Sequence, residues 1–125
     1  MIKVSVMYPN PPGVRFDHAY YRDRHMPMLK ARMGEACRWY SIDKGLAGAP
    51  GQNAPYVAIC HLFCDSVEAY QAAFGPHVRE IMADIPNYTD QAPVASVVVV
   101  ARTTCVAAFT TSTVIPRAGS WRVFT

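Results

Sequence analysis

Residues 56–63, YVAICHLF, constrain the fold more strongly than any other stretch of this sequence. Successive side chains of a strand point to opposite faces of its sheet, and here both sets are apolar apart from one histidine, His61. A strand that is apolar on both faces lies in the interior of a sheet and not at its edge. We therefore expect residues 56–63 to form a central strand.

Three further segments have the composition of strands. Alternating apolar residues, or runs of β-branched and aromatic residues, indicate a strand when Gly, Pro and Asn clusters bound them. The predicted strands cover residues 2–8, 36–45 and 94–101, with a turn NPPG at 10–13 and a loop at 46–55.

The first helix is predicted over residues 17–33, with a start signal, a stop signal and a break. Asp17 is a good N-cap and Gly34 a good left-handed stop. Pro27 has no N–H and its ring crowds the carbonyl four residues earlier, so the helix should kink there. Helical spacing places His25 in one stripe with three apolar or aromatic neighbours, namely Tyr21, Met28 and Leu29.

The second helical region is predicted in two pieces, residues 67–74 and 77–84. Asp65 and Ser66 supply an N-cap before the first piece. Gly75 and Pro76 separate the pieces, and a proline after residue 84 ends the second. The following segment, residues 86–93, is expected to be irregular.

The resulting order, βαββαβ, predicts an α+β fold. Two split βαβ units give a four-stranded antiparallel sheet with both helices on one face, which is the ferredoxin-like arrangement. The other face is then bare, and strands this apolar would leave it too hydrophobic to stay wet. We therefore expect a homodimer formed through the sheet faces.

Size and charge narrow the class of protein. A chain of 125 residues with 51% hydrophobic residues fits one domain, placed at residues 1–101, followed by an atypical tail at 102–125. The domain is formally neutral, and the net charge of +3 comes from three arginines of the tail. Three scattered arginines do not make a nucleic-acid footprint. No apolar run is long enough for a membrane span and the N-terminus lacks a signal-peptide pattern, so a cytoplasmic protein is expected.

His25 is the candidate catalytic residue. An imidazole in an apolar pocket favours its neutral form, which suits a general base that takes a proton from a phenol or an acidic C–H group. The alternative is structural, because a histidine beside a helix kink can hydrogen-bond a freed carbonyl. The residue patterns do not decide between the catalytic and the structural role of His25.

Several other residues are candidates for binding a substrate. A histidine inside a strand needs a polar partner or a cavity, so His61 is either a satisfied core residue or part of a pocket. Tyrosines bring an apolar body with a polar tip, and irregular segments at cavity rims often carry function. The candidate binding residues are Tyr8, Tyr21, His61, Phe74, Asn87 and Tyr88. No H-x-x-x-H pairing, Gly-rich phosphate loop or nucleophile elbow is present, so neither a metal nor a nucleotide is expected.

Three stretches, MIKVSVMYPN, FDHAYYRDRHMPM and YVAICHLFCDSVEAYQAAFGPHVREIMADIPNYTD, resemble the EthD family, named for ethyl tert-butyl ether degradation. The resemblance covers residues 1–94 and includes the pattern Y-x-x-x-H-x-P around His25. It implies a ferredoxin-like protomer of the dimeric α/β barrel superfamily, a ligand cavity between sheet and helices, and no bound cofactor. The superfamily includes cofactor-free monooxygenases, lactone isomerases and polyketide cyclases.

The tail departs from this resemblance. Residues 102–125 contain eight Ser or Thr and no acid, so they are either an added segment or the product of a shifted reading frame. For the domain, two functions remain open. One is a cofactor-independent enzyme of a degradation or biosynthetic pathway, acting on an apolar, preferably aromatic compound with His25 as general acid or base. The other is a non-catalytic dimer that binds such a compound.

Overall fold

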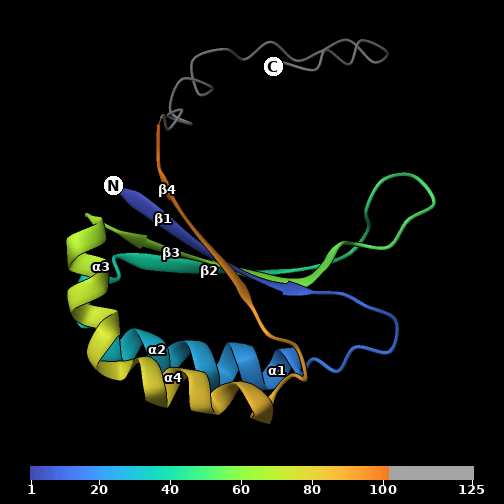
Figure 1. The fold of residues 1–125 in the computed structure, drawn as a ribbon, viewed down its shortest axis with the longest axis horizontal. Coiled ribbons are helices and arrows are strands. Elements are labelled where there is room, and N and C mark those ends of the chain that lie inside the picture. The colour runs from blue at the N-terminus through green and yellow to red at the C-terminus, as the bar shows by residue number, and fades with distance from the viewer. Residues whose placement is uncertain (102–125) are drawn as a thin grey trace, which may run out of the picture.

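The structure is a computed structural model that describes residues 1–101. The predicted tail, residues 102–125, lies outside the described residues. Within them the strands and helical regions follow in the predicted order, with each helical region divided into shorter pieces (Figure 1). None of the helices in this part of the chain has the length and apolar character needed to cross a membrane.

The sheet has four strands in the order β2-β3-β1-β4, and every neighbouring pair is antiparallel. The predicted central strand is confirmed, because β3 pairs with β1 on one side and β2 on the other. This topology is the ferredoxin-like fold that the sequence predicts. The strands are β1 (Ile2–Pro9), β2 (Trp39–Lys44), β3 (Tyr56–Cys64) and β4 (Val94–Val99).

The first helical region consists of α1 (His18–Tyr20), a π-helical turn (Tyr21–His25) and α2 (Met26–Met33). Its predicted ends are confirmed: an Asp17 side-chain oxygen accepts the Tyr20 N–H at 3.0 Å, and Gly34 has a positive φ of 59°. The predicted break at Pro27 takes the form of the π-helical turn immediately before it. There the Met26 N–H donates to the Tyr21 carbonyl, five residues back.

The π-helical turn changes which side chains are buried. A π turn holds about one residue more than an α turn, so residues after it are rotated relative to an unbroken helix. Met26 therefore takes a fully buried position beside His25. Met28, which regular helical spacing places in the buried stripe, is only half-buried.

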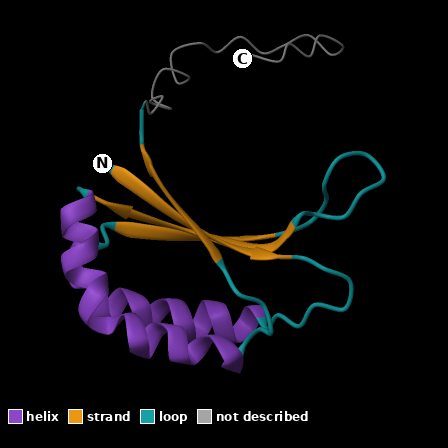
Figure 2. Ribbon diagram, viewed as in Figure 1, coloured by secondary structure: helices purple, strands orange, loops and turns teal. Residues whose placement is uncertain are grey.

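The second helical region consists of α3 (Val67–Phe74) and α4 (Val78–Asp84), separated by the 3-10 turn Gly75–His77 and followed by the 3-10 turn Ile85–Asn87. The Ser66 hydroxyl caps α3 by accepting the Ala69 N–H at 3.1 Å. Both helical regions lie on the same face of the sheet (Figures 1 and 2).

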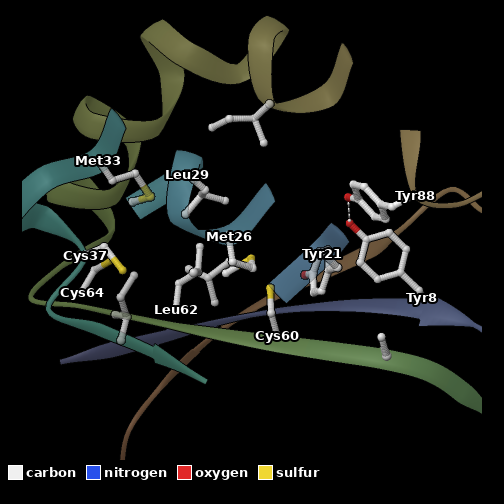
Figure 3. Close-up of a cluster of buried hydrophobic side chains, with 14 residues drawn as sticks. Tyr8, Tyr21, Met26, Leu29, Met33, Cys37, Cys60, Leu62, Cys64 and Tyr88 are labelled. Carbon is white, nitrogen blue, oxygen red and sulfur yellow. Dashed lines mark hydrogen bonds between the residues drawn. The ribbon is translucent and has the colours of Figure 1, made fainter. Parts of the chain in front are cut away.

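The core fills the space between this helical layer and the sheet (Figure 3). Alternate residues of β1 and β3 point into it, including Val4, Tyr8, Cys60 and Leu62. The helical layer contributes Tyr21, Met26, Leu29, Met33 and Ile81. A site that faces this space is enclosed by sheet on one side and helices on the other.

The opposite sheet face, here called the open face, carries no helix (Figure 2). Trp39, Val94 and Val98 on this face are 50%, 51% and 43% exposed. Its centre is polar, because His61 Nδ1 lies 2.7 Å from Ser5 Oγ and His61 Nε2 lies 3.0 Å from Asp43 Oδ2. This polar centre interrupts the predicted apolar face, which Met7 and Ile59 continue on the two central strands.

Candidate active site

His25 ends the π-helical turn and is almost completely buried, with 3% of its surface exposed. Its ring stacks on Tyr21, four residues earlier, with the centroids 5.4 Å apart and the planes 15° apart. His25 Nδ1 lies 2.9 Å from Asp84 Oδ2 at the end of α4. The kinked first helix therefore presents the imidazole to an acid from the second helical region.

Asp84 collects three hydrogen bonds. Besides His25, the Tyr20 hydroxyl donates to Asp84 Oδ1 at 2.6 Å and the Asn87 amide donates to the same oxygen at 2.9 Å. Partial burial alone would raise the pKa of Asp84, but these hydrogen bonds outweigh it and hold that pKa below its usual value. The carboxyl group is therefore ionised at neutral pH.

An ionised Asp84 determines the hydrogen position on His25. A carboxylate can only accept, so Nδ1 carries the hydrogen and Nε2 is left as an acceptor. Burial lowers the pKa of His25, and the opposing effect of Asp84 does not fully cancel it. The imidazole is therefore neutral at neutral pH, with a basic Nε2.

Two tyrosine hydroxyls continue the hydrogen-bond chain from Nε2. The Tyr88 hydroxyl lies 3.4 Å from His25 Nε2 and 2.6 Å from the Tyr8 hydroxyl (Figure 3 shows the Tyr8–Tyr88 bond). Since Nε2 accepts, Tyr88 donates to it and Tyr8 donates to Tyr88. Burial raises the pKa of Tyr8 to about 12 and also raises that of Tyr88, so both hydroxyls keep their hydrogens.

A cavity of about 180 Å³ lies between the sheet and the helices, and His25 is part of its wall. No lysine, arginine, aspartate or glutamate is among its described lining residues. The polar groups available are the His25 ring, tyrosine hydroxyls and one thiol. The lining residues are Val6, Tyr8, Tyr21, His25, Met26, Leu29, Cys60, Leu62, Tyr70, Phe74, Ile81, Met82, Ile85, Pro93 and Ala95.

Four of the seven residues predicted for the site lie together in this cavity wall. They are Tyr8, Tyr21, His25 and Phe74. Tyr88 lies next to them, and its ring centroid is 4.7 Å from that of His25, but it is not part of the wall.

Asn87 and His61 lie elsewhere, against expectation. Asn87 is exposed on the outer side of the helices, where it supports Asp84. His61 does not line the cavity, because its parity in β3 turns it to the open face while Cys60 and Leu62 face the helices. Its ring nitrogens are satisfied there by Ser5 and Asp43.

The sequence patterns do not single out two important positions, Asp84 and Met26. Asp84 lies 59 residues from His25, and that separation carries no pattern. The only available signal was that Asp84 opens the DIPNYTD segment that resembles the EthD family. Regular helical spacing does not predict the burial of Met26, because the π-helical turn changes the buried stripe. Among residues 1–101, no group of three His, Cys, Asp or Glu is placed to hold a metal ion.

The fold and cavity define a ferredoxin-like α+β protein with a buried histidine facing an apolar cavity between sheet and helices. A family model described as the EthD domain matches residues 14–92, so the chain belongs to the EthD family.

Two solved structures are similar to the chain. An EthD-like protein from Ralstonia eutropha JMP134 is 55% identical, with a TM-score of 0.79, over 82% of this chain and 94% of that one. An ethyl tert-butyl ether d (EthD) family protein from Bacillus halodurans C-125 is 17% identical, with a TM-score of 0.54, over 78% of this chain and 95% of that one. The second likeness is one of fold alone. No curated protein matches the chain.

Proposed function

We propose that the protein is a small-molecule enzyme that uses His25 as a general acid and base on an uncharged, apolar ligand, preferably an aromatic one. The observation that carries this proposal is the neutral His25 ring in the wall of an apolar cavity, with Asp84 behind Nδ1. A base that is buried, neutral and supported by a carboxylate has the features of a proton-transfer catalyst. Proton transfer by such a group needs no cofactor.

The proposed step begins when the ligand displaces the Tyr88 hydroxyl from its 3.4 Å contact with His25 Nε2. Nε2 then takes a proton from a phenol O–H or from a C–H group next to a carbonyl. The electron pair of the broken bond stays on the ligand as a phenolate or enolate. The Nδ1–H group of the imidazolium that forms donates to the Asp84 carboxylate, which stabilises the new positive charge. His25 then returns a proton to a different ligand atom, which completes an isomerisation or cyclisation.

The cavity supports a restricted ligand class. A carboxylate ligand would have to leave water with no lysine or arginine in the described wall to pair with it. An apolar protein cavity of about 150 Å³ is sufficient for benzene, so 180 Å³ suits a ligand with a single aromatic ring. The Tyr8 hydroxyl and the His25 ring would hold its one polar group.

The test is the exchange of C–H hydrogens of phenylacetone, a neutral aromatic ketone, with D₂O, followed by NMR. The wild-type protein should accelerate the exchange, and His25→Gln should lower the rate by about 10²–10⁴-fold, the usual contribution of a general base. His77→Gln, which alters a histidine outside the cavity wall, is the matched control. Equal rates in wild type and His25→Gln would contradict the proposed role.

A second candidate is a non-catalytic binding protein. It is favoured by the complete hydrogen bonding of the site, since every buried side-chain nitrogen and oxygen among the described residues has a partner. A binder would release each ligand chemically unchanged, and His25→Gln would weaken binding without changing any rate. Mass spectrometry of ligands recovered after incubation separates the two candidates.

We also propose that a second copy of the chain covers the open face. The support is its exposed apolar margin of Trp39, Val94 and Val98. A monomer rarely leaves such a surface in water when a symmetric partner can bury it. Trp39 stacks on Phe63, with ring centroids 4.9 Å apart, so the two rings form one apolar cluster on this face.

A further inference from the structure

The helical layer has a concave surface on each of its two sides. The inner one is the cavity, of which His25 is part of the wall. The outer one is a groove lined by Tyr20, Arg24, Met28, Glu80, Ala83, Asp84 and Asn87. The 2.9 Å contact between His25 Nδ1 and Asp84 Oδ2 is therefore a direct polar link from the inner cavity to the outer groove.

We propose that Asp84 is the outer end of a proton path, through which His25, part of the cavity wall, exchanges protons with water in the outer groove. The inference deepens the proposed function, because it supplies the route for protons that His25 takes or returns. It assigns Asp84 a positioning and relay role that does not require contact with the ligand.

The exposure of the two side chains fits this direction of transfer. The His25 side chain is 3% exposed, whereas that of Asp84 is 18% exposed. Asp84 Oδ1 is occupied by Tyr20 and Asn87, and Oδ2 is the oxygen that meets His25. The carboxylate is thus held at a fixed angle with one oxygen committed to the imidazole.

The transfer can be written with every proton accounted for. Nε2 gains a proton from the ligand, whose bonding electrons remain on the ligand, and the imidazolium passes its Nδ1 proton to Asp84 Oδ2. Asp84 then releases that proton to water in the groove. The ring is left with hydrogen on Nε2, and it returns to its resting form when Nε2 protonates the product and Asp84 supplies a solvent proton to Nδ1.

A purely structural role is the alternative. In that case Asp84 ties together three side chains from separate elements and still accepts the Nδ1 hydrogen of His25, but it passes no proton to water in the groove. The tautomer of His25 tests the contact that both roles need, and the exchange of its Nδ1 hydrogen with solvent separates the two roles.

The experiment uses the full chain labelled with ¹⁵N-histidine and records the ring nitrogens of His25 by NMR at neutral pH. Wild type should show the Nδ1–H tautomer. Asp84→Asn replaces an obligate acceptor with an amide that can also donate, so the ratio of Nδ1–H to Nε2–H should fall by about tenfold or more, the factor expected when a charge-assisted hydrogen bond becomes a neutral one.

Two variants serve as references. Asp84→Glu keeps the carboxylate and should restore most of the Nδ1–H tautomer. Tyr20→Phe removes a different hydrogen bond from the same carboxylate and should leave the tautomer ratio unchanged. Equal tautomer ratios in Asp84→Asn and Tyr20→Phe would show that the carboxylate does not hold the Nδ1 hydrogen.

A further measurement needs no variant. In D₂O, the Nδ1 hydrogen of wild-type His25 should exchange far faster than the backbone amides of Cys60 and Leu62 in central strand β3. A wild-type His25 in the Nε2–H tautomer, an Nδ1 hydrogen as slow as those amides, or an unchanged tautomer ratio in Asp84→Asn would each overturn the inference. None of these outcomes depends on turnover, so they are separate from a failure of the phenylacetone test.

Discussion

His25 combines burial with a charged neighbour, and the balance between them sets its protonation. Burial lowers its pKa, while the Asp84 carboxylate pulls the pKa back up without restoring the ordinary value. Tyr8, Tyr21, Tyr88 and Cys60 are the other titratable groups around it, and all keep their hydrogens because burial raises their pKa values. Asp84 is therefore the only charged partner of this ring within residues 1–101.

The lowered pKa predicts a pH dependence of stability. Between the folded pKa and the unfolded value of 6.5, the unfolded chain binds more protons, so the free energy of unfolding falls as the pH drops below about 6.5. The contribution of one such group has a slope of at most about 1.4 kcal/mol per pH unit. Above 6.5 its effect is constant.

The measurement is urea unfolding of wild type and His25→Gln across this pH range. The difference in unfolding free energy between them should shift in favour of the variant as the pH falls. His77→Gln is the control, because it shows how the unfolding free energy changes with pH when a different histidine is removed. A difference that stays constant with pH would show that the His25 pKa is not lowered by folding.

The Tyr8–Tyr88 hydroxyl pair predicts a coupled effect. Tyr88→Phe leaves the Tyr8 hydroxyl and His25 Nε2 without their partner and should cost about 1–3 kcal/mol of unfolding free energy. Removing both hydroxyls should cost less than the sum of the two single changes, by about 0.5–2 kcal/mol. A double-mutant cycle measured by urea unfolding checks this, with Tyr40→Phe as a control outside the chain of hydrogen bonds, and strict additivity would contradict it.

At the residue scale, the sequence could predict His25 but not its partner. Helical spacing places Tyr21 and His25 on one side of the helix, and the apolar residues at helical spacing beside them predict an apolar environment for His25. The contact with Asp84 depends on how two helical regions cross, which local patterns do not encode. His61 was ambiguous for the same reason, since parity along β3 separates it from Cys60 but does not say which face bears the helices.

At the element scale, the π-helical turn is the feature that aims the histidine. Pro27 lacks the N–H that would continue regular α-helical bonding, and the chain responds with a wider turn immediately before it. The sequence predicted a break here but not its type. A sharp kink and a π turn are both compatible with the missing N–H of the proline, and the structure contains the π turn.

Deletion of Arg24 tests the role of the turn. Arg24 is an exposed residue of the π turn, and its removal brings Tyr21, His25, Met26 and Leu29 to regular α-helical spacing. The variant should stay folded, with a loss within about 1–3 kcal/mol. His25 should lose its tautomer preference, because the ring then follows Tyr21 by three residues instead of four and loses its 2.9 Å contact with Asp84.

The matched control is deletion of Gln71, an exposed residue inside the regular helix α3. Deletion of Gln71 rotates Ala73 and Phe74 away from their positions on the regular helix. We therefore expect the Gln71 deletion to lower the free energy of unfolding more than the Arg24 deletion does. Urea unfolding and the ¹⁵N-histidine spectrum supply both measurements. A His25 signal unchanged by the Arg24 deletion would contradict the role given to the π turn.

At the scale of the whole molecule, the order of elements was sufficient to predict the layers. Apolar strands and two helical regions in the order βαββαβ leave few ways to cover the sheet, and the ferredoxin-like topology is confirmed. The polar centre of the open face was not predicted. It depends on Ser5, His61 and Asp43 meeting across three strands, and strand register is set by the complete sheet.

The proposed homodimer gives a prediction for this face. Val98 pairs with Lys3 across β4 and β1, so Val98→Lys places a second ammonium group beside the first on the open face. We expect the wild type to sediment as a dimer and Val98→Lys to weaken association by tenfold or more. Val99→Lys is the control, because the 74% exposed Val99 follows on the same strand but faces the other way.

Analytical ultracentrifugation over a range of concentrations measures this directly. Equal association of the two lysine variants would place the contact somewhere other than the open face. A wild type that is monomeric at every concentration would contradict the proposed dimer.

The central claim is that a neutral His25 faces a cavity that binds an uncharged aromatic ligand. Titration of ¹⁵N-histidine-labelled protein with 4-ethylphenol, observed at His25 Nε2, tests it most directly. We predict a saturable shift of that resonance with 4-ethylphenol, little shift with 4-hydroxybenzoate, and no shift of His61 with either compound. A His25 resonance that 4-ethylphenol leaves unchanged, or that both compounds shift equally, would contradict the account.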